Sequence, residues 1–387
     1  MSELTPEDSL RLNVMLAGEL HAVRIDAANM TILGLTSRGT VSVKLHPTGR
    51  SDQYLRTVKE LLATHAIGSP SGYPAYVQHW SRMGQARDNG LDRLLLLGDS
   101  DAVTSVAYSP GLTAELARRS WWAHPVADHA RGMLERECVA QDDVGKVLAD
   151  FLLEHLPFEN EAHVIMRTVR VLLQPGLTDE EARLTLWRKG LLDNAYQVGF
   201  ISRLQDEIPE QLDSREDFSS VEGKLLLLSE QGNVFAQQIK RVLSASGQTF
   251  FQAYGKLLRY PADQDVVLVL LEALSSYFEV LRSLHSCQGE TIEIIHHNVG
   301  VFIANQEPES ALTQLLKTLP ELANEVRVML VLSCIDANIA TPILAQTTAT
   351  GSLMRKKLEP LFNQILQQLS VLIGKNFSAD PVRRRGR

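Results

Sequence analysis

The sequence predicts a mainly α-helical protein, a helical stack with an internal repeat of about 65 residues, preceded by a small antiparallel β meander. Three observations predict this class. Short β-branched runs are confined to the first fifty residues, apolar residues recur at helical spacing after them, and one thirteen-residue pattern occurs twice. A chain of 387 residues is long enough for two or three domains.

The first fifty residues read as a helix followed by a meander. A helix is expected from Thr5 to Leu16, with Thr5 as its cap and Asp8 three residues later, as in a capping box. Gly39 can take the positive φ that a tight turn between two strands needs. The three expected strands are residues 21–25, 30–35 and 41–45.

From residue 51 onwards the apolar pattern has helical spacing, and an acidic stretch over 205–220 is the best candidate for a domain boundary. Residues 291–304 fit both helix and strand, and we predict a helix there. The expected C-terminal helices are 221–243, 250–258, 262–284, 308–316, 320–334 and 352–373. The expected domains are a β-containing subdomain over 1–50, a helical-repeat domain over 51–205, a C-terminal helical domain over 221–374 and a disordered basic tail over 375–387.

The repeat consists of residues 110–122 and 175–187, which are identical at eight of thirteen positions. In each copy Pro-Gly is expected to end the preceding helix, with the glycine in a left-handed conformation. Thr113 and Thr178 are then expected to cap the next helix, with Glu181 completing a capping box in the second copy. The final tryptophans, Trp122 and Trp187, are expected to anchor these helices against their neighbours. If the repeated helical units stack, each unit would bury the apolar face of the next one.

Charge and composition exclude several classes of protein. There are 38 basic and 46 acidic residues, and four of the basic ones lie in the last five positions, so the rest of the chain carries a charge of −12. Such a body repels nucleic acid and anionic lipid. The first residues lack the basic start and apolar stretch of a signal peptide, and the longest apolar runs are too short to span a membrane. We therefore expect a soluble, cytoplasmic protein.

The three cysteines are far apart and form no CxxC motif, which predicts a reduced protein without a disulfide framework. Cys334 lies in an apolar run and is expected to be a buried, inert thiol. Cys138 has acidic neighbours, which disfavour a reactive thiolate. Cys287, two residues after His285, is the weak candidate for a reactive thiol, although a structural role is favoured for it as well.

No cofactor or metal site is expected. The glycine-rich loop over 68–72 lacks the Gly-Lys-Ser/Thr of a phosphate loop, and no Gly-x-Gly-x-x-Gly occurs in the chain. His296 and His297 are adjacent, and adjacent residues of a helix point about 100° apart, so they do not face one ion.

Two aromatic concentrations, around residues 73–80 and 121–125, lie close to arginines. Core packing between helices is the first prediction for these aromatic residues. A partner-binding groove is the alternative, because tryptophan, tyrosine and arginine dominate binding hot spots. The partner-binding candidates are Trp80, Arg82, Arg87, Arg118, Arg119 and Trp121.

Four segments, taken in order, resemble the DsrS family, whose genes lie in the cluster for the reverse-acting dissimilatory sulfite reductase of sulfur-oxidising bacteria. They are Glu7-Asp-Ser-Leu-Arg-Leu-Asn13, residues 68–88, Leu94-Leu-Leu-Leu-Gly-Asp-Ser-Asp-Ala-Val103 and Pro110-Gly-Leu-Thr. The resemblance covers mainly the first 200 or so residues. It implies a soluble cytoplasmic accessory of sulfur-globule oxidation, and it supplies no catalytic residues.

These observations favour a non-enzymatic adaptor or regulator that binds proteins of the cytoplasmic sulfur-oxidation machinery. One alternative is a sulfur carrier or sulfurtransferase that uses a persulfide on Cys287, which requires an exposed thiol of low pKa. Another is an RNA-binding regulator, which requires local positive charge. The arginines that would supply this charge are Arg82, Arg87, Arg93, Arg118 and Arg119.

Overall fold

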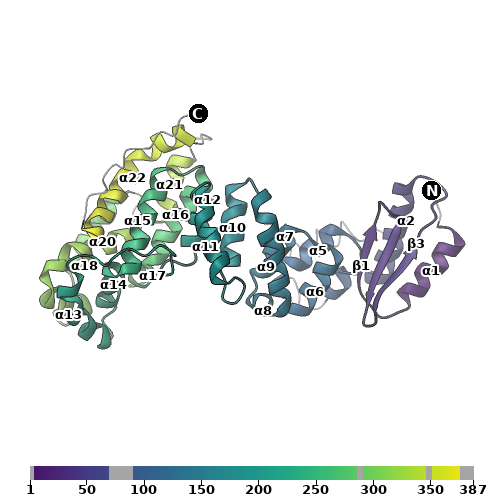
Figure 1. The fold of residues 1–387 in the computed structure, drawn as a ribbon, viewed down its shortest axis with the longest axis horizontal. Helices are drawn as coiled ribbons and strands as arrows, with labels where there is room; N and C mark the ends of the chain where they lie inside the picture. The colour runs from purple at the N-terminus through teal and green to yellow at the C-terminus, as the bar shows by residue number, and fades with distance from the viewer. Residues whose placement is uncertain (1–3, 69–89, 286–290, 346–350, 375–387) are drawn as a thin grey trace. The chain divides into compact units, whose positions relative to one another are not determined.

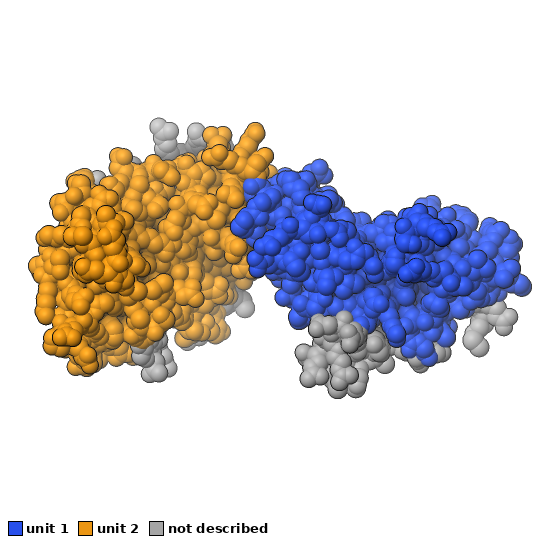
Figure 2. Space-filling view, turned by 90° about the horizontal axis from the view of Figure 1, so that it is seen from below, with its two compact units in different colours: residues 1–158, 174–178 blue, residues 159–173, 179–387 orange. Residues whose placement is uncertain are grey.

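The computed structural model describes residues 4–68, 90–285, 291–345 and 351–374. These ranges are mainly α-helical, with one three-stranded antiparallel sheet near the N-terminus (Figure 1), which confirms the predicted fold class. The chain forms two compact units (Figure 2). The first unit comprises residues 1–158 and 174–178, and the second comprises residues 159–173 and 179–387. The predicted domain boundaries stay predictions, and the acidic stretch over 205–217 is an irregular connector within the second unit.

The sheet is a meander with strand order β1-β2-β3. Gly39, at the start of the third strand, has a φ of +118°, as its place in the turn predicts. The pairs Val23–Gly34 and Ile32–Val43 set the register. The strands are β1 (Leu20–Asp26), β2 (Thr31–Thr36) and β3 (Gly39–Lys44).

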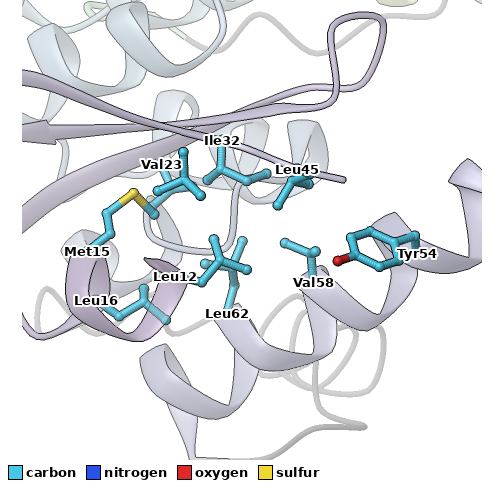
Figure 3. Close-up of a cluster of buried hydrophobic side chains, with 10 residues drawn as sticks. Leu12, Met15, Leu16, Val23, Ile32, Leu45, Tyr54, Val58 and Leu62 are labelled. Carbon is cyan, nitrogen blue, oxygen red and sulfur yellow. The ribbon is translucent and has the colours of Figure 1, made fainter. Parts of the chain in front are cut away.

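Helices α1 (Pro6–Leu16) and α2 (Ser51–Ile67) pack against the sheet and form a small core with it (Figure 3). Leu12 from α1, Ile32 from β2 and Leu62 from α2 are fully buried in this core. Each fully buried side chain of this size contributes about 1.5–3 kcal/mol. The apolar residues whose helical spacing predicted α1 and α2 are therefore the residues that pack against the sheet.

A buried hydrogen-bond network joins the start of α1 to the start of α2. Thr5 Oγ1 accepts from Asp8 N at 3.2 Å, as predicted, but the Asp8 carboxylate does not return to Thr5. Instead Thr5 N donates to the Tyr54 hydroxyl at 3.1 Å, and that hydroxyl donates to Asp8 at 2.6 Å. Burial alone would raise the pKa of Asp8, but the backbone N–H of His46, the Tyr54 hydroxyl and the His46 ring outweigh it and lower that pKa. The carboxylate is therefore a structural anchor.

The remaining described residues of the first unit are mainly helical, and part of them packs against the edge strand β1. Val23 N donates to Leu95 O at 2.8 Å, and the Arg24 guanidinium lies 5.0 Å from the centre of the Trp122 ring. The helices are α4 (Leu91–Leu94), α5 (Ser100–Ala107), α6 (Ala114–Ala123), α7 (Ala127–Leu134), α8 (Glu137–Ala140) and α9 (Asp143–His155), followed by the 3-10 turn η1 (Leu156–Phe158).

The described part of the second unit is built from helices and irregular connectors. They are α10 (Ala162–Leu172), α11 (Glu180–Lys189), α12 (Asn194–Ile201), α13 (Phe218–Glu230), α14 (Val234–Leu243), α15 (Ala245–Arg259), α16 (Gln264–Tyr277), α17 (Glu279–Arg282), α18 (Ile292–Ala304), α19 (Ala311–Thr318), η2 (Pro320–Leu322), α20 (Ala323–Ser333), α21 (Ala337–Leu344) and α22 (Gly351–Ile373). The predicted helix over 291–304 is confirmed as α18, and Thr291 caps it. The single helix predicted over 221–243 is wrong. Gly232 takes a φ of +83° and Asn233 caps a new helix, so α13 and α14 are separate.

An aromatic cluster forms part of the second unit's core. Phe250 stacks on Tyr277 with ring centres 4.5 Å apart, and Phe251 meets the same ring edge-on at 5.0 Å. The Arg241 guanidinium lies 3.8 Å from the Tyr277 ring centre. The hydroxyls of Tyr254 and Tyr277 are buried without a hydrogen-bond partner in the described ranges, and burial raises both pKa values.

The two copies of the repeat form equivalent helices, α6 and α11, but three predicted details are wrong. Thr113 caps α6 as predicted, whereas α11 is capped by Asp179 and not by Thr178. Gly176 has a left-handed φ of +83° in the turn after α10, whereas Gly111 does not take a positive φ. Trp187 is buried, but Trp122 is only half-buried.

Candidate partner-binding site

Helices α6 and α9 are held together by a capping carboxylate. Asp142 accepts from Val144 N at 3.0 Å and thereby caps α9. The same carboxylate forms an ion pair with Arg118 of α6, whose guanidinium also contacts Glu115 at 3.3 Å. One residue therefore starts α9 and fixes α6 beside it.

Three aromatic rings form a row across these two helices. Trp121 of α6 meets Phe151 of α9 edge-on, with ring centres 4.8 Å apart. Phe151 stacks on His155, with ring centres 3.8 Å apart and an interplanar angle of 22°. Trp121 and Phe151 are half-buried, and His155 is exposed. Contacts of this kind orient the rings before any ligand arrives.

An exposed aliphatic residue extends the row. Val147, whose exposed fraction is 53%, lies one turn before Phe151 on the same face of α9. The adjacent face of α9 carries Leu148 and Leu152, which are buried in the core. The apolar face of α9 therefore extends beyond the residues that are buried in the core of the first unit. We call Trp121, Val147, Phe151 and His155 the α6–α9 surface.

The predicted arginines beside this surface are both paired. Arg118 bridges Glu115 and Asp142, and Arg119 donates to Glu115 at 2.9 Å. The hydrogen bond from Arg119 lowers the pKa of Glu115 below its usual range. These ion pairs offset the positive charge that RNA binding would need from Arg118 and Arg119.

Several predicted site residues lie outside the described residues. They are Trp80, Arg82, Arg87 and Cys287, together with the basic tail over 375–387. Of the described candidates, the structure brings Trp121 onto the α6–α9 surface and places Arg118 and Arg119 next to it in ion pairs. Sequence analysis missed Val147, Phe151 and His155, although their spacing of four residues places them on one face of a helix.

The prediction for Cys334 is only half right. Its side chain is buried, with an exposed fraction of 6%, but it is disulfide-bonded, so it is not an inert thiol. The predicted reduced state is therefore wrong for this cysteine. Its sulfur lies 3.2 Å from Nε2 of His285, which is 49 residues away in sequence. The spacing of cysteines along the chain does not predict that Cys334 is disulfide-bonded, because the folded structure decides which sulfur atoms lie close together. Cys138 is exposed and free, and its thiol donates to Leu112 O at 3.3 Å.

The described ranges contain no group of three or more His, Cys, Asp or Glu side chains placed to hold a metal ion. His296 is half-buried, and burial together with the charge of Arg327 lowers its pKa. Across the same ranges, no single helix is long and apolar enough to cross a membrane, although one pair bent by 56°, Pro320–Ser333 with Ala337–Leu344, meets that criterion by length and composition.

Comparisons with protein-family models, curated proteins and solved structures find no match for this chain. The resemblance to the DsrS family therefore stays a prediction. The site rests on the geometry of the α6–α9 surface alone.

Proposed function

We propose that this protein is a non-enzymatic adaptor that binds a partner protein through the α6–α9 surface. The observation that carries the proposal is the preordered row formed by Trp121, Phe151 and His155 with the exposed Val147 beside it. Aromatic residues with an adjacent arginine are typical of binding hot spots. The rings are held before binding, so little side-chain entropy is lost when a partner covers them.

We further propose that the partner belongs to the cytoplasmic sulfur-oxidation machinery. The support for this step is the resemblance to the DsrS family, and the first partner to test is purified reverse-acting dissimilatory sulfite reductase. The α6–α9 surface offers that partner apolar rings flanked by the paired Arg118 and Arg119. No catalytic step is needed for this function.

Direct binding of the two purified proteins tests the proposal. Trp121→Ala and Val147→Asp are expected to weaken the affinity, about 30-fold for the tryptophan if it is a hot spot. Val147 is exposed, so its variant keeps the core intact. Tyr260→Ala is the matched control, because it removes an aromatic ring with an exposed fraction of 57% from the second unit.

Three outcomes are informative. Loss of affinity in both surface variants, with Tyr260→Ala unchanged, supports the proposal. Binding that neither surface variant weakens would contradict the site. No binding of the wild-type chain to the reductase would contradict the assignment to that machinery.

A further inference from the structure

The row of side chains on α9 continues beyond the end of that helix. Val147, Phe151 and His155 follow one another at intervals of four residues, so they form one ridge along α9. Phe158 comes three residues after His155 in the 3-10 turn η1, and its exposed fraction is 80%. The ridge from Val147 to His155 is about 12 Å long, because each residue of an α-helix rises by about 1.5 Å. A partner can therefore contact α9 over about two helical turns.

A line of carboxylates runs beside this ridge. Asp143, Asp150 and Glu154 are exposed. Asp143 lies four residues before Val147, and the other two lie three and seven residues after it, so all three are on the strip of α9 next to Val147. Asp150 pairs with Lys146 at 2.9 Å, whereas in the ranges that the structure describes neither Asp143 nor Glu154 forms an ion pair. Two of these carboxylates therefore have no cationic partner within those ranges.

The basic side chains near the ridge are already bound within the first unit. Lys146 lies on the far side of Asp150 from the ridge, and it also donates to Leu177 O at 3.2 Å. On α6, Arg118 and Arg119 are balanced by the two carboxylates that they contact. Three carboxylates against one ammonium group leave the strip of α9 beside the ridge negative.

The dipole of α9 places the strongest attraction for a cation at one end of the strip. The N-terminal end of a helix carries partial positive charge, which offsets part of the charge of Asp143 in the first turn of α9. The C-terminal end carries partial negative charge, which adds to that of Glu154 in the last turn. A cationic group is therefore attracted most strongly to the Glu154 end of the surface.

The shape of the ridge selects the kind of segment that covers it. Side chains four residues apart form a ridge that fits the groove between two side-chain rows of another helix. An amphipathic helix would lay its apolar stripe on the row from Val147 to Phe158, as such helices do in apolar grooves. Residues at the edge of that stripe would face Asp143 and Glu154, and lysine or arginine there would complement the carboxylates.

The same carboxylates disfavour three other occupants. A second copy of this chain that packed α9 against α9 would bring the carboxylates of both copies together, and like charges repel. Nucleic acid and anionic lipid carry the negative charge that this strip repels. Charge complementarity therefore favours a basic segment of a partner protein.

We propose that the partner contacts the α6–α9 surface with an amphipathic helix whose apolar stripe is flanked by lysine or arginine. This inference rests on the proposed function, since it names the segment of the partner that the same surface recognises. Trp121, Val147 and Phe151 contact the apolar stripe, and Asp143 and Glu154 contact the basic flank. The most basic end of the helix lies over Glu154, where the dipole of α9 adds to the attraction.

Two synthetic peptides of about eighteen residues, long enough to form a helix on binding, test this proposal. Both carry leucine at the same helical spacing, and the remaining positions are mainly lysine in one peptide and mainly glutamate in the other. Binding of each labelled peptide to the full chain is measured by fluorescence anisotropy. The lysine peptide is expected to bind about tenfold more tightly or better. Trp121→Ala removes one ring of the α6–α9 surface and is expected to weaken that binding about tenfold.

The charge variant Asp143→Asn/Glu154→Gln isolates the role of the carboxylates. It is expected to weaken binding of the lysine peptide about threefold to tenfold, while Asp142 still caps α9. The matched control is Glu222→Gln/Glu230→Gln, which makes the same charge change at two exposed positions of α13 and is expected to keep the wild-type affinity. Raising the ionic strength from about 0.05 M to about 0.5 M is expected to weaken binding to the wild type and the control more than to the charge variant.

Equal affinities for the two peptides, or lysine-peptide binding that Trp121→Ala leaves unchanged, would overturn the proposal. An equal loss in the control and in the charge variant would overturn it as well.

Binding of the reductase to the same variants separates this inference from the proposed function. If Trp121→Ala and Val147→Asp weaken reductase binding but the charge variant does not, the surface binds its partner without a basic helix, and only this inference fails. If none of these variants weakens reductase binding, the α6–α9 surface is not the binding site and both proposals fail.

Discussion

The two copies of the repeat place the start of their helices one residue apart. Helix α6 begins after Thr113, whose hydroxyl accepts from Leu116 N at 3.3 Å. Helix α11 begins after Asp179, whose carboxylate accepts from Ala182 N at 2.8 Å. Thr113 is followed by Ala114, which has no side-chain acceptor, whereas Thr178 is followed by an aspartate, a stronger cap than threonine. The shared pattern thus predicts a helix, and one unshared residue sets its start.

The final tryptophans of the two copies differ more. Trp187 has an exposed fraction of 3% and meets Phe200 edge-on, with ring centres 5.3 Å apart. Trp122 is half-buried, and its ring faces the Arg24 guanidinium. The same residue at the same repeat position is therefore part of the core in one copy and part of a surface contact in the other, because its neighbours come from unrelated segments.

Replacing the final tryptophan of each copy by alanine is expected to give the largest difference in unfolding free energy between the two copies. Trp187→Ala leaves a cavity in the core of the second unit and is expected to cost about 3–5 kcal/mol of unfolding free energy. Trp122→Ala should cost clearly less, because part of its ring is already in water. Urea unfolding of both variants measures the difference. Equal losses of unfolding free energy in the two variants would contradict the conclusion that Trp187 is in the core and Trp122 is at the surface. Trp187→Phe keeps most of the packing, so its loss of unfolding free energy is expected to be smaller than that of Trp187→Ala.

The glycines of the two copies provide the next comparison. Gly176 has a φ of +83° and nothing within 4 Å of the position of an added Cβ, so Gly176→Ala is expected to lose about 1–2 kcal/mol from backbone strain alone. Gly111 does not take a positive φ, so Gly111→Ala should carry no such penalty. Urea unfolding of the two glycine variants measures this difference in stability. A loss at Gly111 that equals the loss at Gly176 would contradict the backbone explanation.

Much of the fold could be predicted because its signals are local. The strands near the N-terminus, the caps at Thr5 and Thr113 and the helix over 292–304 follow from spacing within a few residues. The break between α13 and α14 also has a local signal, Gly232 followed by Asn233, but the apolar pattern that continues across it outweighed that signal in the prediction.

The candidate site could be predicted only in part. Trp121 stands out because tryptophan is rare in this chain, but its partner Phe151 lies 30 residues later on another helix. The contact between Cys334 and His285 spans 49 residues in the same way. Such pairs depend on how helices pack, and helix packing is not encoded in the spacing of residues along either helix alone.

Removing the cap of the second copy is expected to have a moderate effect. Asp179→Ala deletes the acceptor for Ala182 N and is expected to cost about 1 kcal/mol, whereas Asp179→Asn keeps an acceptor and should cost little. Thr113→Ala should cost about the same as Asp179→Ala, because each removes one cap from one copy. Thermal unfolding of the three variants tests this. A neutral Asp179→Ala would show that Thr178 takes over as the cap, as the sequence pattern predicted.

The smallest expected effect is a pH dependence confined to the first copy. His124 ends α6, whereas Gly190, which cannot titrate, ends α11. Burial first, and then the charges of His129 and Arg24, lower the pKa of His124. The folded state therefore binds the proton less readily than the unfolded state, whose histidine pKa is about 6.5. The stability that this group contributes is complete above that pH and declines as the pH falls below it.

Hydrogen exchange can separate the two helices in one experiment. Between pH 7.5 and 5.5 the protection factors of α6 amides are expected to fall more than those of α11, and His124→Gln should remove most of that difference. Glu115 on α6 has a lowered carboxyl pKa, so its contribution is lost only at more acidic pH and does not interfere. If both helices lose protection equally, or if the variant behaves like the wild type, the histidine at the end of α6 is not the group that makes the first copy sensitive to acid.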